Sequence, residues 1–181
     1  MKKYIPNSLT ILRGILTICI ILLFFLPIPY RFWFILFFFF VASLTDFLDG
    51  HLARRWEAVS DFGIVFDSLF DKILTLSLYL LLIPYEILPL WVWVLFFIRE
   101  MLVDGMKNFC LGKGCPISAL KSGKWKFTFQ VILLHGCLLL LLFPKVFELQ
   151  IFVYVTAAIS MVLAYVSAFL YARDFFRFLR K

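Results

Sequence analysis

The chain has 181 residues, of which 64% are hydrophobic and 16% are charged, and 24 of them are Phe. Soluble domains contain about 45–50% apolar and about 25% charged residues, and a domain of this size cannot hide so many apolar side chains from water. The composition excludes a disordered chain, a disulfide scaffold and an ordinary soluble domain. The net charge of +7 indicates basic loops at a membrane surface and anionic ligands or lipid headgroups, and not nucleic acid.

Six segments are long and apolar enough to cross a bilayer, which requires about 20 helical residues. They are residues 8–26, 31–55, 61–83, 89–108, 119–143 and 148–173. The first segment contains Arg13 and lacks a small-residue cleavage site, so we expect a retained helix and not a signal peptide. The only long polar stretch is 110–126, which leaves no room for a soluble domain. We therefore expect an all-α, polytopic membrane protein with six transmembrane helices and one domain over residues 1–181.

The basic residues predict the orientation of these helices. Six passes place both termini on one side, and thirteen Lys and Arg residues belong to that side, against Arg31 and Lys145 on the other. Cytoplasmic loops carry the excess of basic residues. We expect a multi-pass protein of the inner (cytoplasmic) membrane, with both termini and the 110–126 loop in the cytoplasm.

Four aspartates interrupt the second and third apolar segments. Asp46 and Asp49 are three residues apart, and Asp67 and Asp71 are four apart, so each pair lies on one helix face. A short turn joins the two helices, which places the pairs at similar depth. An aspartate at the centre of a membrane helix costs about 2.5–3.5 kcal/mol, so a compensating cation is expected. Four carboxylates favour Mg²⁺, Mn²⁺ or Ca²⁺ over zinc or copper, and two such ions would balance the charge.

Small residues accompany the aspartates on the same two helices. Gly50, Ala53 and Gly63 lie on or beside the aspartate faces. Small side chains leave room for a substrate to approach the backbone. Close packing between the two helices is the alternative explanation for the glycines.

The spacing of these residues resembles a known family signature. Residues 46–54 and 63–71 fit the pattern D-x2-D-G-x2-A-R-x8-G-x3-D-x3-D. This pattern resembles the signature of the CDP-alcohol phosphotransferase family, whose core also has six helices. The resemblance implies that Asp46, Asp49, Asp67 and Asp71 bind two Mg²⁺ or Mn²⁺ ions, and that Asp71 is also the general base. It further implies a CDP-binding set of Gly50, Ala53, Arg54 and Gly63, with a snorkelling Arg54 as the alternative.

Further segments resemble one branch of that family, the bacterial phosphatidylglycerophosphate synthases. These segments are IPNSLTILR at 5–13, Lys72 after Asp71, Arg99-Glu100 followed by Lys107, and SGKWK at 122–126. The resemblance implies transfer of the phosphatidyl group of CDP-diacylglycerol to sn-glycerol 3-phosphate with release of CMP, in a membrane enzyme that is commonly a homodimer. Ser68, Lys107 and Phe127 depart from that branch, which leaves serine or inositol phosphate as alternative acceptors.

The acceptor phosphate would require basic side chains. The candidates are Arg99, Lys107, Lys124 and Lys126. Alternatively, Arg99 pairs with Glu100 or Asp104, and each lysine is part of the basic cytoplasmic flank.

Two further pairs of polar residues lie in the predicted helices, and one alternative function remains. Arg13 and Lys72 either line the site or extend to the interface. We expect His51 and His135 to be packing residues. A divalent-cation transporter is a remote alternative to the enzyme, because transport would not require Gly50, Ala53, Arg54 and Gly63 at these offsets.

Overall fold

The computed structural model describes residues 5–55, 61–113 and 121–180. Within those ranges only the backbone is described for residues 5–7, 47–55, 61–65, 67, 111–112 and 121–122. The elements are α1 (Ile5–Phe25), α2 (Arg31–Arg55), α3 (Asp61–Leu82), the 3₁₀ turn η1 (Ile83–Tyr85), α4 (Leu90–Gly112), α5 (Lys121–Leu142) and α6 (Phe147–Leu179). The described residues contain no strand, so the all-α prediction is confirmed for them.

The predicted helix positions are close to the observed ones, except at the C-terminus. The sequence predicted the last helix over 148–173, whereas α6 runs Phe147–Leu179. No Gly or Pro follows residue 173, so nothing in the chain stops the helix where the basic residues begin. The short turn η1 was not predicted; it contains Pro84 and is followed by Glu86 in the left-handed region, at φ 56°.

Four helical stretches of the described residues are long and apolar enough to cross a membrane. They are Ser8–Phe25, Ser68–Tyr85, Gly123–Leu142 and Phe147–Leu179. Helix α4 has a comparable length but carries Arg99, Glu100, Asp104 and Lys107. The protein is therefore an all-helical, multi-pass membrane protein.

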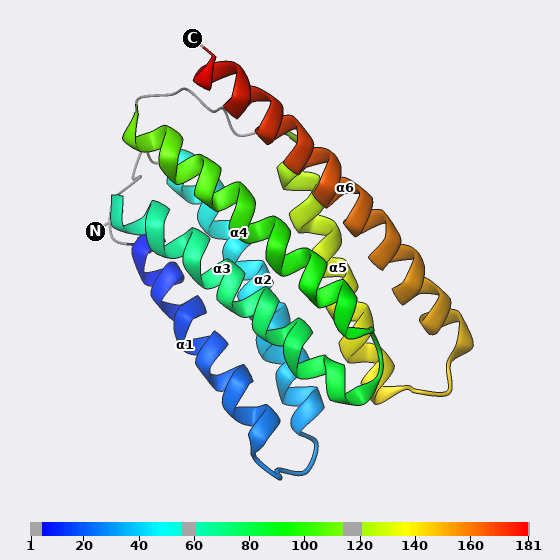
Figure 1. The fold of residues 1–181 in the computed structure, drawn as a ribbon. Coiled ribbons are helices and arrows are strands. Elements are labelled where there is room, and N and C mark those ends of the chain that lie inside the picture. Colours follow the sequence, from blue (N-terminus) through cyan, green and yellow to red (C-terminus); the bar gives the residue numbers. More distant parts are fainter. Residues whose placement is uncertain (1–4, 56–60, 114–120, 181) are drawn as a thin grey trace.

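The helices alternate in direction along one bundle axis (Figure 1). The start of α1, the end of α2, the start of α3 and the end of α6 lie at one end of the bundle (Figure 1). The α1–α2, α3–α4 and α5–α6 connections lie at the other end (Figure 1). The C-terminal half of α2 and the N-terminal half of α3, which carry the aspartates, lie toward the first of these ends, and α1 packs against both helices.

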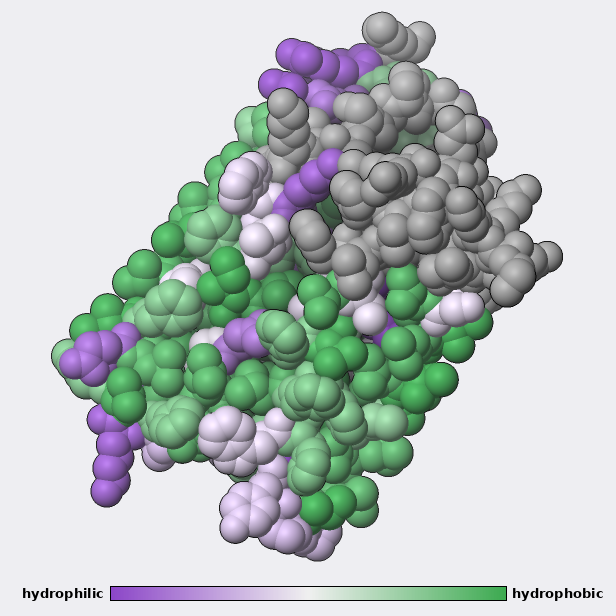
Figure 2. Space-filling model, turned by 180° about the vertical axis from the view of Figure 1, so that it is seen from behind, coloured by the Kyte–Doolittle hydropathy of each residue, from purple (hydrophilic) through white to green (hydrophobic). Residues whose placement is uncertain are grey.

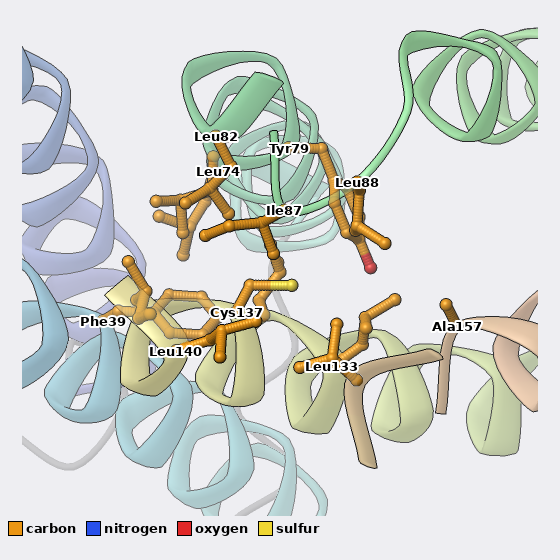
Figure 3. Packing of buried hydrophobic residues seen from close by; sticks show 14 of the residues in the cluster. Phe39, Leu74, Tyr79, Leu82, Ile87, Leu88, Leu133, Cys137, Leu140 and Ala157 are labelled. Atoms are coloured by element: carbon orange, nitrogen blue, oxygen red, sulfur yellow. The ribbon is translucent and has the colours of Figure 1, made fainter. Parts of the chain in front are cut away.

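The core is apolar, and so is much of the outer surface. Figure 3 shows side chains of α2, α3, α5 and α6 packed together, including Phe39, Leu74, Leu133 and Cys137, all of them buried. Hydrophobic residues also cover most of the described face in Figure 2. Large side chains such as Phe25 and Phe169 are about 70% exposed, at 72% and 70%. Such a surface is stable against lipid and not against water.

The end of the bundle far from the aspartates has its own charged contact. Arg31 begins α2 and donates hydrogen bonds from Nη1 to the carbonyls of Phe24 and Leu26, at 3.1 and 3.2 Å. Its Nη2 donates to the hydroxyl of Tyr85, at 3.1 Å. Arg31 thus satisfies carbonyls left free at the end of α1 and ties that end to η1.

Candidate functional site

Three helices bring Arg13, Asp46 and Asp71 together. Nη1 of Arg13 in α1 lies 3.1 Å from Oδ1 of Asp46 in α2 and 2.6 Å from Oδ1 of Asp71 in α3. The Arg13 side chain is fully buried, at 0% exposure, whereas the carboxylates are 25% and 20% exposed. The two aspartates therefore face a common point that solvent or a ligand can reach from their side, and Arg13 closes that point from α1.

Close packing of α1 against α3 places Arg13 at this point. A Cβ atom on Gly14 would lie 2.8 Å from Cζ of Phe70, so only glycine leaves space for that ring at its present position. Phe70 directly precedes Asp71 in the chain. The hydroxyl of Thr17 donates to the carbonyl of Arg13 at 2.8 Å, and that of Thr75 to the carbonyl of Asp71 at 2.8 Å. Both hydroxyls use backbone carbonyls one turn back, so neither competes for the carboxylates.

The other predicted metal and CDP residues are placed only by their backbones. Asp49, Gly50, Ala53 and Arg54 lie on α2, and Gly63 and Asp67 lie on α3. Their side chains lie outside the described residues. Both helices are continuous through these positions, so Asp49 follows Asp46 by one turn and Asp67 precedes Asp71 by one turn.

The point at which the Asp46 and Asp71 carboxylates meet, called the acidic point below, has the oxygen donors that a divalent cation prefers. Carboxylate oxygens of Asp46 and Asp71 both contact one nitrogen atom, so they are close enough for one cation to contact both. Anionic oxygens are the ligands that Mg²⁺ and Mn²⁺ prefer. Among the side chains that the structure describes, no group of three potential metal ligands occurs. A complete site would need Asp49 or Asp67 as well.

A second charged cluster joins α4, α5 and α6. Glu100 binds Nη1 of Arg99 through Oε2, at 3.0 Å, and the ammonium of Lys126 through Oε1. Arg99 also donates from Nε to the carbonyl of Ala164, at 3.1 Å, and from Nη2 to the hydroxyl of Ser167. Arg99, Glu100 and Lys126 are all buried. Of the two partners suggested by the sequence for Arg99, the structure therefore shows Glu100.

Asp104 is instead the partner of Lys72. The ammonium of Lys72 pairs with Oδ2 of Asp104 and donates to the hydroxyl of Ser68 at 2.9 Å. Lys72 follows Asp71, and Asp104 lies one turn after Glu100 on α4. The pair thus links the acidic point to the second cluster. One feature of the sequence could have indicated this role of Asp104. Glu100 and Asp104 are four residues apart, which places two acids on one face of α4.

The remaining acceptor candidates lie toward the same end of the bundle. Lys107 of α4 lies 4.8 Å from the ring centroid of Tyr171 in α6, a cation–π contact. A Cβ on Gly123 of α5 would lie 3.6 Å from the hydroxyl of the same tyrosine. Tyr171 therefore lies between α4 and α5. Lys124, the residue after Gly123, is exposed. Lys107 and Lys124 form the part of this region that an anion could approach, whereas Lys126 is buried.

His135 is a packing residue, as expected. Its Nδ1 hydrogen-bonds with the carbonyl of Val131 at 2.8 Å, and its ring centroid lies 4.5 Å from that of Phe39. His51 lies on α2, with its side chain outside the described residues.

Comparison with known proteins identifies the family. Residues 3–171 match the sequence model of the CDP-alcohol phosphatidyltransferases. The chain belongs to this family. The resemblance inferred from residues 46–71 is thus confirmed over nearly the whole chain.

Three bacterial relatives bear the same name, CDP-diacylglycerol–glycerol-3-phosphate 3-phosphatidyltransferase. The protein of Haemophilus influenzae is 33% identical over 143 residues, which cover 76% of this chain and 77% of the relative. That of Escherichia coli K12 is 32% identical over 139 residues, covering 74% and 76%. That of Cereibacter sphaeroides is 34% identical over 137 residues, covering 73% of this chain and 62% of the relative.

Proposed function

We propose that this protein transfers the phosphatidyl group of CDP-diacylglycerol to sn-glycerol 3-phosphate, giving phosphatidylglycerophosphate and CMP. The observation that carries the proposal is the convergence of Asp46 and Asp71, from the two helices that bear the family signature, on one point. The names of the relatives support the choice of donor and acceptor.

In this proposal the four signature aspartates hold two Mg²⁺ or Mn²⁺ ions. Divalent ions of this kind neutralise charge on a diphosphate and on the departing CMP. Asp71 takes the proton from the acceptor hydroxyl on its carboxylate, as a general base. Gly50, Ala53 and Gly63 leave space for the CDP group against the backbone of α2 and α3, and Arg54 binds its phosphates.

The acceptor phosphate binds the basic residues of α4 and α5. Lys124 is exposed and Lys107 is half-buried, so both can contact an anion directly. Arg99 and Lys126 are held by Glu100, and they contribute positive charge from within the bundle. The ion pair of Lys72, the neighbour of Asp71, with Asp104 on α4 supports an acceptor hydroxyl near the base.

We further propose six membrane spans in the inner membrane, with both termini and the site on the cytoplasmic side, and a homodimer as in the resembled family. The distribution of Lys and Arg supports this orientation. The start of α1 and the end of α6 lie at the same end of the bundle, which supports an even number of passes (Figure 1).

The decisive experiment compares acceptors. Purified protein in detergent receives CDP-diacylglycerol and Mg²⁺ or Mn²⁺, and CMP release is measured with glycerol 3-phosphate, serine or inositol phosphate. We expect release with glycerol 3-phosphate and its loss on addition of EDTA. Faster release with serine or inositol phosphate, which Ser68 leaves open, would contradict the acceptor. Metal uptake into vesicles without CMP release from any acceptor would favour a transporter.

A further inference from the structure

Arg13 differs from the other arginines of the described chain in its surroundings. It lies in the middle of an otherwise apolar helix and is 0% exposed. Its Nη1 contacts carboxylates from two other helices, Asp46 and Asp71. A snorkelling arginine extends its charge to the membrane surface, whereas this one keeps it within the bundle. An arginine in this position requires an anionic partner, and the partners here are predicted metal ligands.

We propose that Arg13 is a built-in counter-cation of the acidic site: it neutralises Asp46 and Asp71 when no divalent ion is bound, and it competes with the ion for these carboxylates. In this role it is a positioning residue and not a catalytic one. The inference rests on the proposed function only in taking Mg²⁺ or Mn²⁺ as the competing ion.

The geometry makes the two cations mutually exclusive at this point. One oxygen of each carboxylate already contacts the same guanidinium nitrogen. A cation held between those two oxygens would compete with that nitrogen for the same space. The two positive charges would also repel each other strongly in a buried site. The guanidinium must therefore withdraw when the ion binds these oxygens, and this displacement weakens ion binding.

The backbone of Arg13 is fixed, so withdrawal concerns the side chain. Gly14 allows Phe70 of α3 to pack directly against α1. Thr10 and Thr17, one turn to either side of Arg13, are buried at 1% and 2% exposure. The three helices therefore pack together around Arg13, held in part by its ion pairs.

The test compares Arg13→Gln and Arg13→Lys with the wild type and with Arg31→Gln. Arg31 is the matched control because its removal deletes the same charge about 22 Å along α2 from Asp46, at 1.5 Å per residue. Each full-length protein is purified in detergent and stripped with EDTA. Mn²⁺ is then titrated, with the free ion followed by electron paramagnetic resonance and the melting temperature Tm recorded in parallel.

We expect Arg13→Gln to have a Tm at least about 5 °C below the wild type in EDTA and to recover in Mn²⁺. Its Kd for Mn²⁺ should be about tenfold lower than that of the wild type, because the competing cation is absent. Arg13→Lys should fall between the two, since one ammonium replaces a guanidinium that reaches both carboxylates. Arg31→Gln should retain the wild-type Kd.

An unchanged or higher Kd in both Arg13 variants would overturn the proposal. If Arg13→Gln cannot be purified, Arg13→Lys decides by the same measurement. A wild type that binds Mn²⁺ and releases CMP, together with unaltered Kd values in the variants, would refute the role of Arg13 and leave the proposed function standing. A wild type that neither binds Mn²⁺ nor releases CMP would refute both.

Discussion

Asp71 is the residue on which the most interactions of the acidic site depend. It contacts Arg13 directly, and the next residue, Lys72, pairs with Asp104 on α4. A change at Asp71 therefore affects the base, the predicted metal site and the ion pair with α1, whichever alcohol is the acceptor.

We expect Asp71→Asn to reduce CMP release by at least about 100-fold with every acceptor, because the amide cannot accept the hydroxyl proton. Release of CMP by the purified variant is the measurement. The control is Asp174→Asn, which makes the same change at an exposed residue paired with Arg173, and should keep wild-type turnover. Substantial turnover by Asp71→Asn would contradict the assignment of the base.

At this scale the sequence predicted which acids meet but not how they are neutralised. Helical spacing and a short turn were sufficient to predict that Asp46 and Asp71 face each other. The position of Arg13 depends on which face of α1 turns toward α2 and α3, and a mainly apolar helix with few polar residues leaves that open. The burial of Arg99 likewise depends on contacts with Ala164 and Ser167, which are far away in sequence.

At the scale of elements, the α1–α3 contact is the packing feature closest to the site. Gly14 and the ring of Phe70 occupy neighbouring space, and that ring also packs 5.9 Å from Phe66, centroid to centroid. A larger residue at position 14 would shift Phe70 and the adjoining Asp71.

We expect Gly14→Ala to destabilise the protein by about 1–3 kcal/mol through overpacking, and to slow CMP release by displacing Asp71. Gly105→Ala is the matched control: it is also helical, and nothing lies within 4 Å of its added Cβ. That variant should be stabilised by up to about 1 kcal/mol, because alanine favours a helix. The Tm in detergent measures both effects, and equal shifts of the same sign would contradict this packing argument.

Helix positions were largely predictable because apolar length defines them. The second helix was predicted over 31–55 and observed at Arg31–Arg55. The pairing of helices was less predictable, since lipid and neighbouring helices both favour apolar side chains. Gly14 illustrates this point: its small size mattered only once Phe70 was placed against it.

For the whole molecule, alternation of the helices determines which ends can share a membrane side. The start of α1 and the end of α6 lie at the same end of the bundle (Figure 1), and the sequence after residue 172 contains Arg173, Arg177, Arg180 and Lys181. Basic residues favour the cytoplasmic side, which supports the proposed orientation.

A reporter fusion tests this orientation. We expect green fluorescent protein at the C-terminus to fluoresce and alkaline phosphatase at the same place to be inactive, because the phosphatase requires export. Alkaline phosphatase fused after Lys145, between α5 and α6, should be active. The reverse pattern would show that the membrane orientation is wrong without affecting the chemistry.

The cluster around Glu100 has a consequence for the choice of alcohol. The single carboxylate of Glu100 pairs with two cations, Arg99 and Lys126. These three buried groups therefore carry one positive charge in excess. Salt screens buried charge poorly, and an electrically neutral alcohol would leave the excess in place. Selection among alcohols in this protein would then depend on net charge before shape, and a dianionic phosphate monoester would outcompete zwitterionic serine even if both fitted the space.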